Sequence, residues 1–332
     1  MEDKNIFKNN TNLSKAIMSL SLIAFSVIIG GLFFNSQPPN LPGRYIETTT
    51  GPQEIYFTAV RLPEKLDFSG EPVPLENFDV SESLDREMLI VTNFHSQDLL
   101  YLKKTIRYFS VIEPILKKND IPDDFKYLAL AESGFLDKAI SPSGAIGIWQ
   151  FMKSAATENG LEVNEEVDER YHIEKATQAA CRYLKNSYAR YGSWTMVAAS
   201  YNAGVSGMNR QIDIQDSKNY YDLLLNDETA RYVFRILALK MVIGEPEKYG
   251  FKVSEAEKYP IIPVSEVKVT GSVNSFTDFA RAHNINYKLL KQFNPWLRQP
   301  YLKNLKKKVY TVKIPEVGEY RKFVFSENND SQ

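Results

Sequence analysis

The stretch between residues 86 and 250 constrains the fold most, because its apolar residues recur at helical spacing and no segment within it alternates as a strand does. Ser96 is placed to cap the first helix, and Pro114 is expected to kink or divide that helix. Glycines follow three later helices, which are expected over residues 174–191, 194–203 and 228–243. The pattern predicts an all-α domain over residues 86–255.

A further short helix is expected before residue 134, and it ends close to a glutamate. Glu132 lies in the last turn of a short apolar helix that Gly134 is placed to end, and the small, turn-forming loop SPSGAIGIWQF follows as residues 141–151. The apolar residues expected around the carboxyl group are Phe125, Leu128, Phe135 and Trp149. Burial among them would raise the pKa of Glu132 and keep it protonated, as an acid that protonates a glycosidic oxygen must be. Glu132 is therefore the candidate catalytic residue.

The scarcity of cysteine and histidine excludes several other chemistries. Cys181 is the only cysteine and cannot form an internal disulfide. His95, His172 and His283 are scattered without the spacing of a zinc site, and no glycine-rich phosphate loop is present. We therefore expect no metal and no cofactor. The formal net charge of −1 gives no field that would attract nucleic acid, so no such partner is expected.

The N-terminal region predicts export. Residues 16–34 form a run of 19 residues without a charge, which would span about 28 Å as a helix. Three lysines precede the run, so residues 1–34 are read as a cytoplasmic stub followed by a signal anchor, with a cleaved signal peptide as the alternative. Prolines and polar residues predict an extracytoplasmic linker over residues 35–85. The rest of the chain is expected to be periplasmic and membrane-anchored.

The C-terminal part has a different pattern. Segments that alternate like strands stand near both ends of residues 262–316, and Ser275 is placed to cap the first of two short helices between them. A ββ/αα unit of this size suits a binding module rather than a catalytic domain. Residues 317–332 are expected to form a tail. The fold class is thus mostly α, with a small α+β module at the C-terminus.

Several ordered motifs resemble one known family over roughly residues 100–252. They are Glu-Ser-Gly-Phe at 132–135, the loop at 141–152, Val-Asp-Glu-Arg at 167–170, Tyr-Asn-Ala-Gly at 201–204 and Glu-Thr-x-Arg-Tyr-Val at 228–233. This part of the chain is similar to the lytic murein transglycosylases with a goose-lysozyme-like (SLT) catalytic domain, and most closely to the membrane-bound type D group. The resemblance implies a lysozyme-like helical fold and a carbon-oxygen lyase that acts on peptidoglycan in cell-wall remodelling.

The resemblance also implies roles for particular residues. Glu132 matches the family's single acid/base, and Ser141 and Gln150 match residues that contact the bound sugar. Tyr201 and Asn202 match residues that line the groove. Tyr232 matches a tyrosine whose hydroxyl reaches toward the catalytic carboxylate, and it completes the expected substrate-binding set. The expected partner is the peptidoglycan glycan strand, bound by a monomer.

Residues 262–316 resemble a LysM module, a peptidoglycan-binding unit. Ser275, Phe276 and Phe279 fit its first helix, and Leu289 and Leu290 fit its second. The turn after the first strand reads Gly-Ser-Val-Asn at 271–274, where the family has Gly-Asp-Thr. Glycan binding and a purely structural role both remain open for this module.

Two alternatives to the transglycosylase remain. Hydrolysis of a glycoside normally needs two carboxylates, and Asp137 is the only candidate for the second in the segment that follows Glu132. If water is the nucleophile, the chain is a muramidase. If Glu132 is inactive, the chain is a non-catalytic peptidoglycan-binding scaffold whose working part is the C-terminal module.

Overall fold

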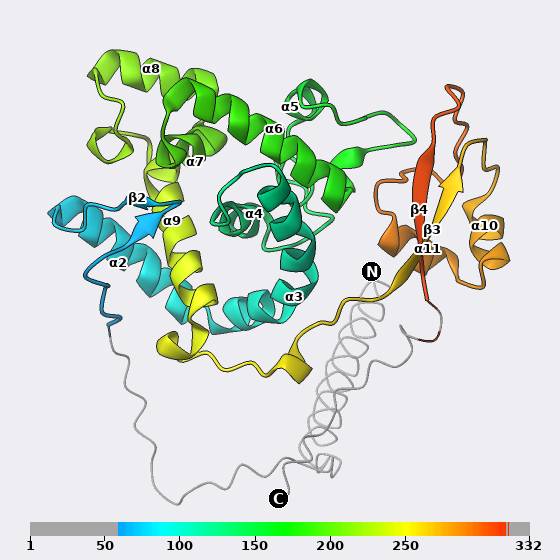
Figure 1. Ribbon diagram of the computed structural model, residues 1–332, viewed down its shortest axis with the longest axis horizontal. Coiled ribbons are helices and arrows are strands. Elements are labelled where there is room, and N and C mark those ends of the chain that lie inside the picture. The colour runs from blue at the N-terminus through cyan, green and yellow to red at the C-terminus, as the bar shows by residue number, and fades with distance from the viewer. Residues whose placement is uncertain (1–58, 317, 319–332) are drawn as a thin grey trace, which may run out of the picture. The chain divides into compact units, whose positions relative to one another are not determined.

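The computed structural model describes residues 59–316 and residue 318. The elements keep the labels of Figure 1. In chain order they are β1 (Asp67–Phe68), β2 (Glu71–Pro72), α2 (Phe78–Asn93), α3 (His95–Lys118), α4 (Phe125–Ser133), α5 (Lys153–Glu158), η1 (Glu169–Tyr171), α6 (Ile173–Tyr191), α7 (Trp194–Ala203), α8 (Val205–Gln215), η2 (Tyr220–Asp222), α9 (Asp227–Gly244), η3 (Pro246–Tyr249), η4 (Glu255–Glu257), β3 (Val264–Val269), α10 (Phe276–Ala282), α11 (Tyr287–Phe293) and β4 (Tyr310–Pro315). Between residues 73 and 263, all of them described, no β-strand forms, so the predicted all-α character is confirmed.

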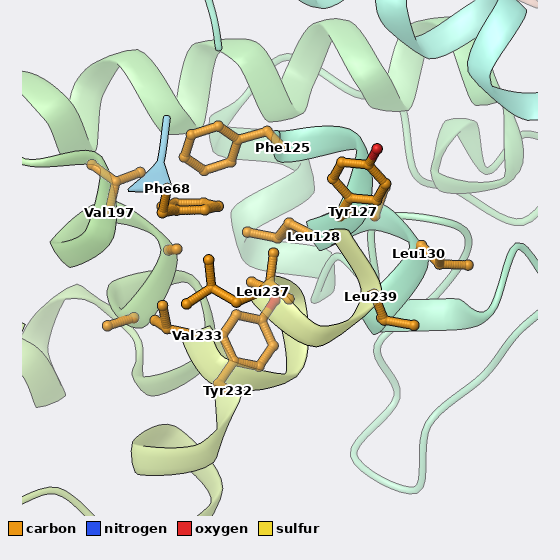
Figure 2. Packing of buried hydrophobic residues seen from close by; sticks show 14 of the residues in the cluster. Phe68, Phe125, Tyr127, Leu128, Leu130, Val197, Tyr232, Val233, Leu237 and Leu239 are labelled. Atoms are coloured by element: carbon orange, nitrogen blue, oxygen red, sulfur yellow. The ribbon is translucent and has the colours of Figure 1, made fainter. Parts of the chain in front are cut away.

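Helices α4 and α9 form the centre of the helical region. α9 packs against α2, α4 and α7, and its residues Val233 and Leu237 are fully buried. α4 is short and apolar on nearly every side, with Phe125, Leu128 and Leu130 fully buried, as expected of a helix enclosed by others. Figure 2 shows these side chains together in one cluster. The last turn of α4, which carries Glu132, is therefore held on a rigid base.

The predicted linker ends earlier than residue 85. Phe68 of β1 is fully buried and packs edge-on against Phe125 with ring centroids 5.4 Å apart, and Leu84 of α2 is also fully buried. Glu71 of β2 accepts hydrogen bonds from the backbone amides of Trp194 and Thr195 at the start of α7. Prolines and polar residues dominate this stretch, so local composition did not reveal its few buried contacts. Residues 67–85 belong to the helical domain rather than to a linker.

Most helix ends fall where the sequence placed them. Gly134 and Gly192 end α4 and α6 in the left-handed conformation, and Ser193 caps α7. Differences arise where packing outweighs local preference. α3 begins at His95 and continues through Pro114, because Ile112 and Leu116 on either side are fully buried. α9 is capped by Asn226 and begins at Asp227, one residue before the expected start at residue 228. The short helices α5 and α8 were not predicted, and neither was α2, which begins within the predicted linker.

The C-terminal module contains the expected strands and helices in the order β-α-α-β (Figure 1). β3 and β4 pair antiparallel, with Val264 opposite Pro315 and Val269 opposite Tyr310. Phe276 of α10, Leu290 of α11 and Val312 of β4 are fully buried between the helices and the sheet. The mostly helical fold class with a small α+β module is confirmed.

Several predicted regions lie outside the described residues. They are the stub and apolar run at residues 1–34, the first part of the linker at residues 35–58 and, except for residue 318, the tail at residues 317–332. Within the part that is described, no helix is both long enough and apolar enough to cross a bilayer.

Candidate active site

A cleft of about 740 Å³ lies where the N-terminal half of α3, the end of α4 and the loop over residues 139–150 meet. Its volume is in the range of ligand-binding pockets. Polar groups converge on it from all three elements, and exposed apolar side chains such as Leu136 and Ile140 form part of its wall. A cleft with both kinds of surface suits a sugar chain, which has polar edges and apolar ring faces.

Glu132 reaches this cleft because α4 stops directly after it. Gly134 ends the helix with φ of 57°, and a Cβ atom there would lie 2.8 Å from the ring of Tyr101. The turn that follows the glutamate therefore favours a glycine. Glu132 is partly exposed, and its surroundings are apolar enough that burial raises its pKa to about 7. The protonated form of Glu132 is therefore much more populated at neutral pH than that of an ordinary glutamate.

Tyr232 of α9 donates a hydrogen bond from its hydroxyl to the Glu132 carboxylate. Tyr232 is 2% exposed, so the bond lies in a poorly hydrated environment. It favours the ionised form of Glu132 and opposes the larger effect of burial on the pKa. The hydroxyl also fixes the orientation of the carboxyl group, which suits a residue that passes a proton in a set direction.

The loop brings Ser141 and Gln150 to the same cleft as Glu132. The Ser141 hydroxyl accepts a hydrogen bond from the Ala145 amide at 3.0 Å, and the Gln150 side-chain nitrogen donates to the Gly147 carbonyl at 2.7 Å. Each side chain thus supports its own loop. Gln150 adopts a φ of 47°, a left-handed conformation that non-glycine residues rarely take.

Tyr201 and Asn202 do not line the cleft. The Tyr201 hydroxyl donates to the Trp149 carbonyl at 2.7 Å, which ties α7 to the loop. The Asn202 side chain accepts a hydrogen bond from the Thr229 hydroxyl at 2.9 Å, which ties α7 to α9. In this structure both residues connect elements around the site, and direct contact with a substrate remains a prediction for them.

Gln97, Tyr101 and Lys104 of α3 line the cleft and were not predicted as site residues. The Lys104 ammonium donates to the Gly134 carbonyl at 2.9 Å, and burial lowers its pKa. The three residues are spaced by four and three positions, so they share one helix face. Their spacing on one face of the helix was the available sequence signal.

Glu132 is the only carboxylic acid among the described residues that line the cleft. Asp137 does not line it and instead acts electrostatically on Lys104 and Tyr108. Asp98 is 1% exposed, and burial raises its pKa to about 7, but it too is absent from the cleft wall. Within the described residues, no group of three or more potential metal ligands comes together.

Comparison with known proteins matches both parts of the chain to family models. Residues 109–224 match the transglycosylase SLT domain, and residues 265–318 match the soluble lytic transglycosylase C-terminal LysM-like domain. Two curated relatives, each named membrane-bound lytic murein transglycosylase D, come from Escherichia coli strains K12 and O6:H1. Each is 26% identical over 184 residues, which cover 54% of this chain and 40% of the relative. The chain therefore matches less than half the length of these relatives.

A solved structure, the lytic transglycosylase Slt from Pseudomonas aeruginosa in an inactive mutant form, matches at 18% identity with a TM-score of 0.36. It covers 47% of this chain and 27% of the other. The fold and the cleft define a mostly helical domain, whose cleft is lined by one carboxylic acid among the described residues, with an attached βααβ module. More particularly, residues 109–224 are similar to the transglycosylase SLT domain family and residues 265–318 to the C-terminal LysM-like domain family.

Proposed function

We propose that this protein is a peptidoglycan lytic transglycosylase that cleaves the MurNAc–GlcNAc β-1,4 bond and leaves 1,6-anhydro-MurNAc ends. The observation that carries the proposal is that Glu132 is the single carboxylic acid among the described residues that line the cleft, with a pKa raised to about 7. The match to the SLT domain and the names of the curated relatives support the same reaction.

In the proposed mechanism, Glu132 first acts as a general acid. It gives its proton to the glycosidic oxygen as the bond from that oxygen to C1 of MurNAc breaks. The ionised Glu132 then takes the proton of the C6 hydroxyl of the same sugar, and the C6 oxygen bonds to C1. One residue therefore serves both steps, and no second carboxylate is needed to activate water.

Ser141 and Gln150 are proposed to hold the sugar beside Glu132, since all three side chains line the same cleft. We also propose that the chain works outside the cytoplasm, anchored through residues 16–34. The LysM-like module is proposed to bind glycan strands. The apolar run, the lysines before it and the module's family match support these assignments.

The chemical nature of the product tests the reaction. Full-length protein is incubated with purified peptidoglycan, and the new ends are identified by mass spectrometry. We expect anhydro ends, which are lighter than hydrolytic ends by one water. Reducing ends would make the protein a muramidase, and a folded protein that releases no product would favour the non-catalytic scaffold.

The pH dependence of cleavage tests the role of Tyr232. The acid must be protonated at the start of each cycle, so the rate is expected to fall as the pH rises through about 7. The hydrogen bond from Tyr232 lowers the pKa of Glu132, so its loss in Tyr232→Phe raises that pKa. The alkaline limb of the pH–rate profile should then move to higher pH.

Tyr220→Phe is the matched control, because Tyr220 is also buried but donates to the Ala230 carbonyl at 2.7 Å. Its alkaline limb should coincide with that of the wild type. If the alkaline limb stays in place in Tyr232→Phe, or moves equally in both variants, the Tyr232 hydroxyl does not set the pKa of Glu132.

A further inference from the structure

The LysM-like module is joined to the helical domain by backbone pairing as well as by its connecting chain. The Asp168 amide donates to the Trp296 carbonyl at 2.9 Å, and the Arg298 amide donates to the Glu166 carbonyl at 2.8 Å. Val167 and Leu297 form an antiparallel bridge between these bonds. A segment of the helical domain thus pairs with the module as a short strand would.

Side chains of that segment belong to the core of the module. Val167 is 1% exposed and Tyr171 is 5% exposed, and both pack in one cluster with Trp296 and Leu297. The Arg298 guanidinium lies 4.1 Å from the centre of the Tyr171 ring. Removing the module would therefore expose apolar surface on the helical domain, which favours the docked arrangement.

Arg170 lies within the same docked segment but points toward the cleft loop. Its guanidinium forms two parallel bonds with Asp168, at 2.9 and 2.8 Å, and both side chains are nearly buried. A third nitrogen donates to the carbonyls of Gly144 and Phe151, each at 3.3 Å. The planar guanidinium can reach both partners at once, which an ammonium cannot do.

The loop that Arg170 contacts is the one that carries Ser141 and Gln150. Gly147 lies against the Arg170 backbone so closely that a Cβ atom would be 2.1 Å from the Arg170 carbonyl oxygen. The docked segment therefore touches the loop near its start, its middle and its end.

We infer that Arg170 is a positioning residue through which the docked LysM-like module holds the loop over residues 141–151 in the shape that presents Ser141 and Gln150 to the glycan. The part of this inference that concerns the glycan rests on the proposed function. The mechanical part, that the docked segment orders the loop, does not. The module then supports the loop of the candidate active site, in addition to its proposed role in binding glycan.

Hydrogen exchange of full-length protein measures the mechanical part directly. Arg170→Lys keeps the charge but loses the paired bonds, and Val167→Asp places a carboxylate in the module core. Arg170→Lys is expected to speed exchange of the loop amides about tenfold, the effect of losing one hydrogen bond to a charged group. Val167→Asp is expected to have a similar effect, because it loosens the segment that holds Arg170. Arg281→Lys is the control, since Arg281 is 75% exposed and pairs with Asp278 on the module surface.

Steady-state cleavage supplies the second measurement. Ser141 and Gln150 of the loop are proposed to bind the sugar and take no part in proton transfer. Arg170→Lys should therefore raise KM several-fold with a smaller change in kcat. The alkaline limb of the pH–rate profile, which Glu132 sets, should not shift. The KM of the double variant Arg170→Lys/Val167→Asp should be close to that of either single variant. The reason is that both substitutions break the same connection between the module and the loop. If Val167→Asp does not fold, Arg298→Ala weakens the docking more mildly.

Unchanged loop exchange in Arg170→Lys would overturn the inference. So would a docking variant in which the amides of the docked segment, residues 166–171, exchange faster while the loop stays protected. Absence of cleavage by the wild type would remove the proposed function, yet the exchange rates would still decide whether the module orders the loop.

Discussion

Replacing Glu132 with glutamine is expected to reduce cleavage by roughly 10³-fold or more, in the range that loss of a general acid–base group produces. Glutamine keeps the shape of the side chain and can still meet the Tyr232 hydroxyl, but it has no proton to give to the glycosidic oxygen. Since no other carboxylic acid among the described residues lines the cleft, no neighbour can take over the role. Product release from peptidoglycan, followed by mass spectrometry, measures the loss.

The same substitution should not destabilise the fold. Burial raises the pKa of Glu132 from 4.5 to about 7, so between these values the folded protein binds more protons than the unfolded chain. Folding stability therefore falls as the pH rises through this window. Glu132→Gln removes that dependence, so its free energy of unfolding relative to the wild type should be higher at pH 8 than at pH 5. Denaturant unfolding at the two pH values measures it.

Glu158→Gln is the control, because Glu158 is exposed at the end of α5 and does not line the cleft. It should keep full activity and the wild-type pH dependence of stability. Retention of more than a tenth of the activity in a folded Glu132→Gln protein would assign the acid to another group.

Gly147→Ala is expected to destabilise the protein by about 2–5 kcal/mol, the sum of a left-handed backbone cost and an overpacking cost. Gly147 has φ of 79°, and the added methyl group would lie 2.1 Å from the Arg170 carbonyl oxygen. That oxygen is backbone, so only a shift of the loop or of the docked segment can relieve the clash. Displacement of about 1 Å at the loop should also reduce cleavage by about 10²-fold.

Gly144→Ala separates the two costs. Gly144 lies in the same loop with φ of 84°, but no atom stands within 4 Å of where its Cβ would be. Only the backbone cost of about 1–2 kcal/mol should appear. Denaturant unfolding of both variants gives the comparison, and equal losses of stability would show that close packing on Arg170 contributes nothing.

Features that depend on a few consecutive residues were predictable. Gly134 ends α4 and Ser193 caps α7 because each acts on the adjacent helical turn. The placement of Glu132 in the last turn of a buried helix followed from the same local rules. The strands and helices of the LysM-like module were predictable for the same reason, since alternation and capping are read within about ten residues.

Features that join distant segments were not predictable from residue patterns. Phe68 and Glu71 stand in a proline-rich stretch, and their burial or pairing depends on Phe125 and on the start of α7. Lys104 reaches the site from 30 residues before the carbonyl it binds. Nothing in the sequence near Arg170 shows that its third nitrogen meets the loop of Gly144, 26 residues away.

The sequence by itself determined the helical fold class, the C-terminal module and the candidate acid, because these depend on periodicity, caps and side-chain chemistry. Tertiary structure alone decided that Glu132 has no second carboxylic acid beside it in the cleft, among the residues described. It also decided that Tyr201 connects α7 to the loop and Asn202 connects α7 to α9 rather than lining the cleft, and that the module packs against the segment that supports the loop. The physical reason is that burial and hydrogen bonding are settled by whichever segments the fold brings together, however far apart they lie in the chain.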